Sequence, residues 1–136
     1  MATPDLGPGA RLVGTAMSVP AVAIRASCHL SVAVDAFVRT GMRHLVVVDD
    51  DARTVGIVSY EHVSSAWLDP ESRRAGRVEQ VLARPQPAAT PEMTVRAAAR
   101  LMVAEQVDVL PVVSEDGLLQ GVLTALDVVA LVAEEA

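Results

Sequence analysis

The chain has 136 residues, of which 51% are hydrophobic and 21% are charged, so it is long enough and apolar enough to fold around a core of its own. Acidic residues outnumber basic ones 17 to 11, and the net charge of -6 argues against binding to the phosphate backbone of a nucleic acid. Aromatic residues make up only 2% of the chain, which argues against stacking platforms for bases.

Three further features concern the cellular compartment. Cys28 is the only cysteine, which excludes an intrachain disulfide and favours a reducing compartment, and we interpret it as a small apolar side chain. Residues 1–10 have neither a cationic start nor an apolar run, so we expect a flexible lead-in and no signal peptide. The most apolar segment, Gly121–Ala133, contains Asp127 and is shorter than the roughly 20 residues of a membrane-spanning helix. The sequence therefore predicts a cytoplasmic protein without a membrane segment.

The chain contains one unit twice. A shift of 65 residues aligns Val13–Val63 with Val78–Val128 without a gap, and identities fall at structural positions such as Gly56 and Gly121. A tandem duplication of one supersecondary unit explains this pattern. The expected organisation is a lead-in at 1–10, a first repeat at 11–68, a linker at 69–77 and a second repeat at 78–136.

The first half of each repeat predicts a turn, a strand and a helix. In the first repeat, a helical turn at Gly14–Met17 ends before Pro20, because proline discourages continuation of a helix. A short strand follows at Val22–Ile24. The apolar spacing then predicts an amphipathic helix at Leu30–Thr40, with Ser27 near its start.

The second half of the first repeat predicts a hairpin and a last helix. The β-branched run "HLVVVD" is typical of a buried strand, and the turn "DDAR" leads into "TVGIVS". Ser59 then begins a helix at Tyr60–Trp67.

The second repeat predicts the same elements. They are a turn at Glu79–Leu82 ended by Pro85, a strand at Ala88–Thr90, a helix at Val95–Glu105 beginning near Pro91 or Glu92, a hairpin of "VLPVVS" and "LQGVLT", and a helix at Ala125–Ala133 begun by Thr124. The fold class is α/β (α+β), with the order β-α-β-β-α in each repeat.

Each copy resembles a cystathionine-β-synthase (CBS) domain, and the chain resembles a stand-alone CBS-domain pair, or Bateman module, over residues 11–133. The resemblance rests on the strand ending in "VVVD" or "PVVS", the glycine in the following strand, and the hydroxyl residue that begins the last helix. It implies two repeats packed about a pseudo-twofold axis, with two clefts between them. In this family the clefts hold adenosine-containing ligands such as AMP, ATP or S-adenosylmethionine.

The resemblance implies a ligand site at the last helix of the second repeat. The family motif has Ser or Thr at the helix start and Asp three residues later, and Thr124 and Asp127 match it. A carboxylate can accept hydrogen bonds from both ribose hydroxyls, and a hydroxyl at a helix N-terminus can bind a phosphate. The same spacing is also close to a capping box, in which the two side chains only satisfy backbone donors. In the first repeat Ser59 keeps the hydroxyl, but His62 replaces the aspartate and cannot accept two diol hydrogen bonds.

Further ligand contacts follow from the resemblance. Arg43 and His44 lie where other members of the family have a basic pair that reaches phosphates, and a solvated loop is the alternative interpretation. Arg25 and Arg84 are weaker candidates. Short extended backbone could bond an adenine edge and apolar side chains could contact it, and ordinary core packing is again the alternative. The residues implied for this wall are Ala88, Ala89, Thr90, Val109 and Pro111.

No catalytic or metal-binding pattern stands out. The three histidines and Cys28 lack zinc-like spacing, and no nucleophile elbow, P-loop or Rossmann glycine pattern occurs. We expect no enzyme activity, no required cofactor and no metal.

The sequence thus predicts a regulatory module that binds an adenosyl ligand and acts on a protein partner in trans. A ligand-free dimerisation or interaction module is the alternative. Apolar residues surround much of the last helix, which favours a twofold homodimer. Trp67 either joins that interface or caps its own core. The residues around the last helix are Val128, Val129, Leu131 and Val132.

Overall fold

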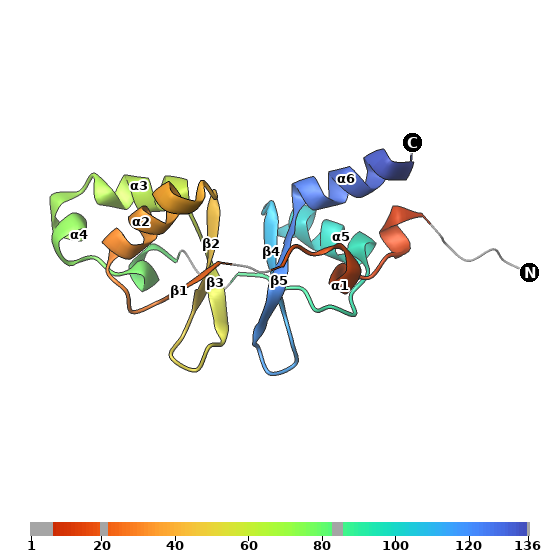
Figure 1. Cartoon of the computed structure of the whole chain (residues 1–136), viewed down its shortest axis with the longest axis horizontal. Helices are drawn as coiled ribbons and strands as arrows, with labels where there is room; N and C mark the ends of the chain where they lie inside the picture. The colour runs from red at the N-terminus through yellow and green to blue at the C-terminus, as the bar shows by residue number, and fades with distance from the viewer. Residues whose placement is uncertain (1–6, 20–21, 83–85, 136) are drawn as a thin grey trace, which may run out of the picture. The chain divides into compact units, whose positions relative to one another are not determined.

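The computed structural model describes residues 7–19, 22–82 and 86–135. The chain divides into two compact units (Figure 1): unit 1 is Met1–Pro20 with Pro87–Ala136, and unit 2 is Ala21–Gln86. The N-terminal segment therefore packs with the second repeat. Val13, for example, is fully buried in the core of unit 1, and its N–H donates to the carbonyl of Met93 over 2.8 Å.

Unit 2 is a three-stranded sheet with helices. Strand β2 lies in the middle, parallel to β1 and antiparallel to β3, and the β2–β3 hairpin contains a register shift after Val47. Its elements are β1 (Ala23–Arg25), α2 (Leu30–Thr40), β2 (His44–Val48), β3 (Thr54–Ser59), α3 (Tyr60–Trp67), α4 (Pro70–Ala75) and the 3-10 helix η2 (Val78–Val81).

The local sequence explains where the helices of unit 2 begin and end. The His29 side chain accepts a hydrogen bond from the N–H of Ser31 at the start of α2, so His29 is the cap and not Ser27. Gly41 ends α2 in a left-handed conformation with a φ of 69°, which glycine adopts without steric cost. The core between the sheet and the helices is aliphatic: Ile24, Leu30, Ala33, Leu45, Val47, Val58, Val63 and Val78.

Unit 1 repeats this arrangement with a smaller regular sheet. Strands β4 and β5 form an antiparallel hairpin, Ala89 pairs with Val112 at one edge, and Ser18 pairs with Val122 at the other. The elements are η1 (Pro8–Ala10), α1 (Val13–Ala16), α5 (Val95–Glu105), β4 (Val109–Val113), β5 (Leu119–Thr124) and α6 (Ala125–Glu135).

The α+β fold class is confirmed, and three predicted helices have the expected bounds at both ends: Leu30–Thr40, Tyr60–Trp67 and Val95–Glu105. The cap of α5 is Thr94, not Pro91 or Glu92. Within the segments expected to be a lead-in and a linker, the structure contains η1 and α4. Pro20, Arg84 and Pro85 lie outside the described residues.

The predicted strand at Ala88–Thr90 is wrong, because only Ala89 pairs with β4. Its N–H donates to Pro111 over 2.9 Å, and its carbonyl accepts from Val113 over 2.8 Å. The next ladder bonds on either side would require N–H groups from Pro87, Pro91 and Pro111, and proline has none. Three prolines thus reduce the expected strand to a single bridge.

Candidate functional site

Thr124 and Asp127 form a reciprocal hydrogen-bonded pair at the start of α6. The N–H of Thr124 donates to Oδ2 of Asp127 over 2.9 Å, and the N–H of Asp127 donates to Oγ1 of Thr124 over 3.0 Å. This is the geometry of a capping box, with aspartate in place of the usual glutamate. The capping interpretation of this motif is therefore observed directly.

A third residue, Ser18, reaches the same carboxylate from the N-terminal segment. Its hydroxyl donates to Oδ1 of Asp127 over 3.4 Å, and its backbone exchanges hydrogen bonds of 2.8 and 3.1 Å with Val122 in β5. Gly121 permits this crossing, because a Cβ there would lie 2.8 Å from the carbonyl oxygen of Ser18. Ser18 is not among the site residues that the sequence predicts. A glycine inside a strand indicates a close approach of another backbone, and Gly121 was that signal.

The carboxylate of Asp127 keeps capacity for a ligand. An ionised carboxylate has about four lone-pair sites, and hydrogen bonds from residues that the structure describes use two of them, one on each oxygen. The N-terminus of α6 has less capacity than expected for a phosphate. The N–H of Ala125 already donates to the carbonyl of Asp108 over 2.8 Å, and that of Asp127 donates to the hydroxyl of Thr124.

The equivalent position in unit 2 has different chemistry. Oγ of Ser59 accepts from the N–H of His62 over 3.2 Å, as Thr124 does from Asp127. The ring Nδ1 of His62 lies 2.9 Å from that same hydroxyl, whereas Asp127 bonds the backbone of its cap residue. His62 thus occupies the hydroxyl that a ligand would use and offers no carboxylate.

The other residues implied for the second repeat divide into two groups. Val109 pairs with Thr124 in the β4–β5 ladder, and Pro111 pairs with Val122, so both lie close to the cap. Ala89 lies on the opposite edge of β4, so β4 and β5 separate Ala88–Thr90 from Ser18. Val109, Pro111 and Ala89 are all buried, as ordinary core residues are.

Arg43 and His44 belong to unit 2. Arg43 is exposed, and its carbonyl accepts from the N–H of Tyr60 over 2.9 Å. His44 is half-buried at the first position of β2, opposite Ser59. Trp67 is half-buried as well, and its ring meets that of His29 edge to face with centroids 6.4 Å apart. Trp67 packs against the core of its own unit, as one of its two predicted roles requires.

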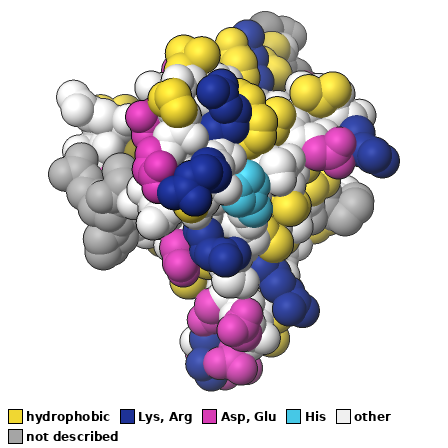
Figure 2. Space-filling view, turned by 90° about the vertical axis from the view of Figure 1, so that its left-hand side faces the viewer, with side chains coloured by type: hydrophobic (Ala, Val, Ile, Leu, Met, Phe, Trp, Pro, Cys, Tyr) yellow, Lys and Arg dark blue, Asp and Glu magenta, His cyan; other side chains and the backbone are white. Residues whose placement is uncertain are grey.

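The surface of unit 2 carries both signs of charge. Figure 2 shows basic and acidic side chains interspersed on this face. Unit 2 also contains the ion pairs Arg39–Asp35 and Arg74–Glu71. Within residues 7–19, 22–82 and 86–135, no group of three His, Cys, Asp or Glu side chains could hold a metal ion. No helix in that part of the chain is long and apolar enough to cross a membrane.

A family model described as "CBS domain" matches this chain twice, at residues 13–69 and 78–134. The chain belongs to the CBS-domain family. The first match runs from the start of α1 to the cap residue of α4, and the second runs from the start of η2 into α6. Among curated proteins no match was found.

Solved structures of CBS-domain pairs share the fold. The CBS pair of protein MJ0100, in complex with 5-methylthioadenosine and S-adenosyl-L-methionine, is 21% identical with a TM-score of 0.80, covering 92% of this chain and 98% of that one. CBSX2 in complex with AMP is 27% identical with a TM-score of 0.77 and the same coverages. The cytosolic domain of the Mg2+ channel MgtE in complex with ATP is 26% identical with a TM-score of 0.77, covering 89% of this chain and 48% of that one.

Proposed function

We propose that this CBS-domain pair is a non-catalytic regulatory module that binds an adenosine-containing ligand such as AMP, ATP or S-adenosylmethionine at Asp127. The observation that carries the proposal is the carboxylate of Asp127, which retains about two unused lone-pair sites beside two hydroxyl groups. Complexes of CBSX2 with AMP and of the MgtE cytosolic domain with ATP support this class of ligand.

The contacts around Asp127 suggest how each group acts. Asp127 accepts hydrogen bonds from the two ribose hydroxyls, while Thr124 and Ser18 hold the carboxylate and offer further hydroxyl contacts. Val109 and Pro111 remain proposed apolar contacts, and Ala88, Ala89 and Thr90 remain proposed backbone contacts. Arg43 and His44 remain proposed phosphate contacts, with Arg43 as a donor fork. Because His62 replaces the carboxylate in unit 2, we expect one equivalent of ligand per chain.

Binding at this site would act on the N-terminal segment. A ribose that takes up Oδ1 of Asp127 competes with the 3.4 Å hydrogen bond from Ser18, which is long and easily exchanged. The ligand then favours whichever arrangement of residues 17–19 suits it better, and such differential affinity is what a sensor requires. We propose that this change is transmitted to a protein partner in trans.

Thermal unfolding with and without AMP, ATP and S-adenosylmethionine tests the proposal. A ligand at 100 times its dissociation constant should add about 2.7 kcal/mol of apparent stability. The stabilisation should vanish in Asp127→Ala and persist in the matched variant His62→Ala. GMP is the control for a nonspecific nucleotide effect. No ligand-dependent shift with any of the three compounds would refute sensing, and a full shift in Asp127→Ala would refute the site.

The observed capping box favours one alternative, a ligand-free interaction module. In that case Asp127 only stabilises α6, and its substitution by Ala should cost about 0.5–2 kcal/mol with or without nucleotide. The same unfolding experiment separates the two functions, because Asp127→Ala removes a ligand-dependent stabilisation only if the protein is a sensor.

We also propose a homodimer with twofold symmetry, the commonest oligomer. Large apolar side chains exposed on the helices of both units support it, such as Val38 and Val103 at 78% and 80% exposure. Sedimentation equilibrium at micromolar concentration should give the mass of two chains. A single-chain mass across that range would contradict the homodimer.

A further inference from the structure

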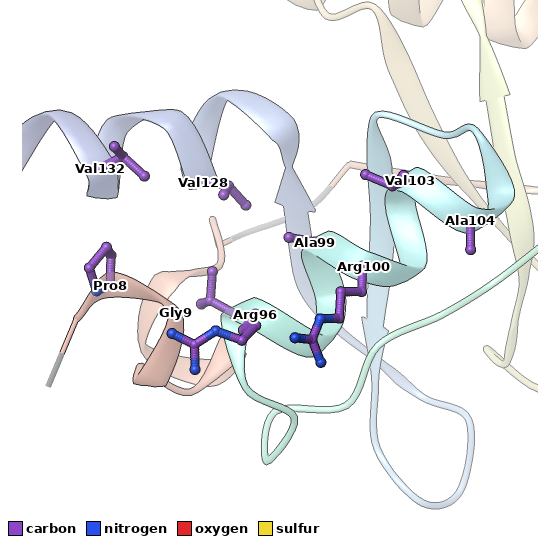
Figure 3. A pocket seen from close by; sticks show the side chains of 10 residues that line it. Pro8, Gly9, Arg96, Ala99, Arg100, Val103, Ala104, Val128 and Val132 are labelled. Atoms are coloured by element: carbon purple, nitrogen blue, oxygen red, sulfur yellow. The ribbon is translucent and has the colours of Figure 1, made fainter. Parts of the chain in front are cut away.

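A groove lies between α5, α6 and η1 in unit 1 (Figure 3). Its volume is about 430 Å³, which is within the range of about 300–1,000 Å³ that is typical of small-molecule sites. Apolar side chains of the two long helices form much of its wall: Val95, Ala99, Val103, Val128 and Val132. The residues proposed above as contacts of an adenosyl ligand are not among those that line this groove.

The same place in unit 2 has larger side chains of the chain itself. By the 65-residue repeat, Ala99 corresponds to Val34 and Val132 corresponds to Trp67. Val34 and Trp67 pack against the core of unit 2, whereas Ala99 and Val132 line the groove of unit 1. The two copies share a fold, so the smaller residues leave space in unit 1 where unit 2 has an indole ring. The groove therefore suits an apolar body of about the size of that ring.

The charges at the groove differ between the copies as well. Of the residues described around it, the two charged ones are both arginines, Arg96 and Arg100. By the repeat they correspond to Ser31 and Asp35, and Asp35 forms an ion pair with Arg39. Two like charges four residues apart on a helix repel each other, so the arginine pair on α5 has a local cost. In a chain with a net charge of -6, this pair makes the edge of the groove complementary to an anion.

The arginines lie at the end of the groove next to η1. Figure 3 shows both guanidinium groups on one side of α5, with Arg96 turned toward Gly9. The contact is close, because a Cβ at Gly9 would lie 2.8 Å from a terminal guanidinium nitrogen of Arg96. Cationic donors are thus held at one end of an apolar groove.

We propose that this groove binds a small amphipathic carboxylate. The apolar body of the ligand lies against α5 and α6, in the place that Trp67 has in unit 2, and its carboxylate is bound by Arg96 and Arg100. A guanidinium group presents parallel N–H donors that match the two oxygens of a carboxylate, and burial of the apolar body supplies the rest of the affinity. The site is separate from the one proposed at Asp127, and neither depends on the other.

Calorimetric titration with two carboxylates tests the ligand class. Indole-3-acetate and octanoate are the probes, and indole-3-acetamide and octan-1-ol are their neutral counterparts. We expect saturable binding of at least one carboxylate, one per chain, and binding of its neutral counterpart that is weaker by about tenfold or more, because hydrogen bonds to the charged group are lost. Failure of both carboxylates to bind, or equal binding of the neutral compounds, would overturn the proposal.

Substitutions test the residues. Arg96→Gln and Arg100→Gln should each weaken binding of the carboxylate by about fivefold or more, whereas Arg39→Gln on the exposed side of α2 is the matched control and should leave it unchanged. Val132→Trp gives unit 1 the residue of unit 2 and should abolish binding by filling the groove. Ala99→Val, which copies Val34, replaces it if Val132→Trp does not fold by circular dichroism. Unchanged affinity in both arginine variants, or in the filled variant, would refute the site.

Nuclear magnetic resonance locates the probe and tests the other possible occupant. Amide shifts should change along α5 and the C-terminal half of α6 when the carboxylate is added. Shifts centred on residues 124–127 would place the probe at the proposed adenosyl site and overturn the second one. Affinity that falls as the protein concentration rises would mean that a second copy of the chain occupies the groove, which would also overturn the proposal. The nucleotide-dependent stabilisation, measured separately, reports on the Asp127 site in either case.

Discussion

The two units close the outer edge of their hairpins with different chemical groups. In unit 1 the backbone of Ser18 bonds both the N–H and the carbonyl of Val122. In unit 2 the equivalent residue is Ile57, and the side-chain amide of Gln86 bonds its N–H over 2.8 Å and its carbonyl over 3.0 Å. A carboxamide has one donor side and one acceptor side, so it can replace a peptide group at a strand edge.

This difference has a consequence for the two candidate sites. The segment that closes the edge in unit 1 also brings a hydroxyl to Asp127, since Ser18 is part of it. In unit 2 the closing group is the amide of Gln86, which bonds both backbone groups of Ile57, and the helix that follows carries His62 in place of the aspartate. Two departures in one repeat show that the copies differ in chemistry at this position while sharing the order of their main elements.

The largest effect should come from the cores of the two units, which we expect to contribute equally to the free energy of unfolding. Leu110 in unit 1 is fully buried and its repeat partner Leu45 in unit 2 is 1% exposed. Leu110→Ala and Leu45→Ala should each lower the free energy of unfolding by about 2–5 kcal/mol, measured by urea titration, because each leaves a cavity. Ser65→Ala, at an exposed position of α3, should change it by less than about 0.5 kcal/mol. A loss below about 1 kcal/mol for only one of the two leucines would mean that the cores are not equivalent.

An intermediate effect should come from the edge groups. Gln86→Ala leaves the part-buried N–H and carbonyl of Ile57 without their partner, at a cost of about 1–3 kcal/mol. Ser18→Ala keeps both backbone bonds and loses only the 3.4 Å contact, so it should cost less than about 1 kcal/mol. Gln86→Glu can accept from the N–H of Ile57 but cannot donate to its carbonyl. Its loss of stability should lie between those of Ser18→Ala and Gln86→Ala. Equal losses for Gln86→Ala and Ser18→Ala in thermal unfolding would contradict this difference.

The sequence predicted the elements whose signals are local. The apolar period of α2 and α5 determined both ends of each helix, because the same residues that set the period are the ones buried against the sheet. Thr124 and Asp127 were also accessible, since they are three residues apart and their contact lies within one helical turn. Both interpretations of that pair were open from spacing alone, and the structure adds that the cap is formed.

Contacts between distant segments were not predictable in the same way. Ser18 and Asp127 are far apart in the chain, and nothing in the sequence around Ser18 distinguishes it from a loop residue. The prolines around Ala88–Thr90 are a local signal against the predicted strand. Prolines at positions 87, 91 and 111 together remove each neighbouring donor, but position 111 matters only once the register with β4 is known.

The smallest effect should come from His62, and it tests whether one residue accounts for the different caps. His62→Asp should let the carboxylate accept from the N–H of Ser59, as Asp127 does from Thr124, and place a negative charge in the first turn of α3. We expect a gain of about 0.5–1 kcal/mol in the free energy of unfolding, lower at high salt, because a charge near a helix N-terminus is screened by ions.

The same substitution in a Ser59→Ala background provides the control. Without the hydroxyl, the N–H of residue 62 loses its acceptor, but the backbone N–H of residue 59 can still donate to the new carboxylate, so most of the gain should remain. A gain that disappears in the Ser59→Ala background and does not depend on salt would mean that His62→Asp acts by removing the contact between the imidazole and the Ser59 hydroxyl and not by completing a cap. The reverse change, Asp127→His, should then lose at least as much stability in unit 1 as His62→Asp gains in unit 2, because Asp127 also accepts from Ser18.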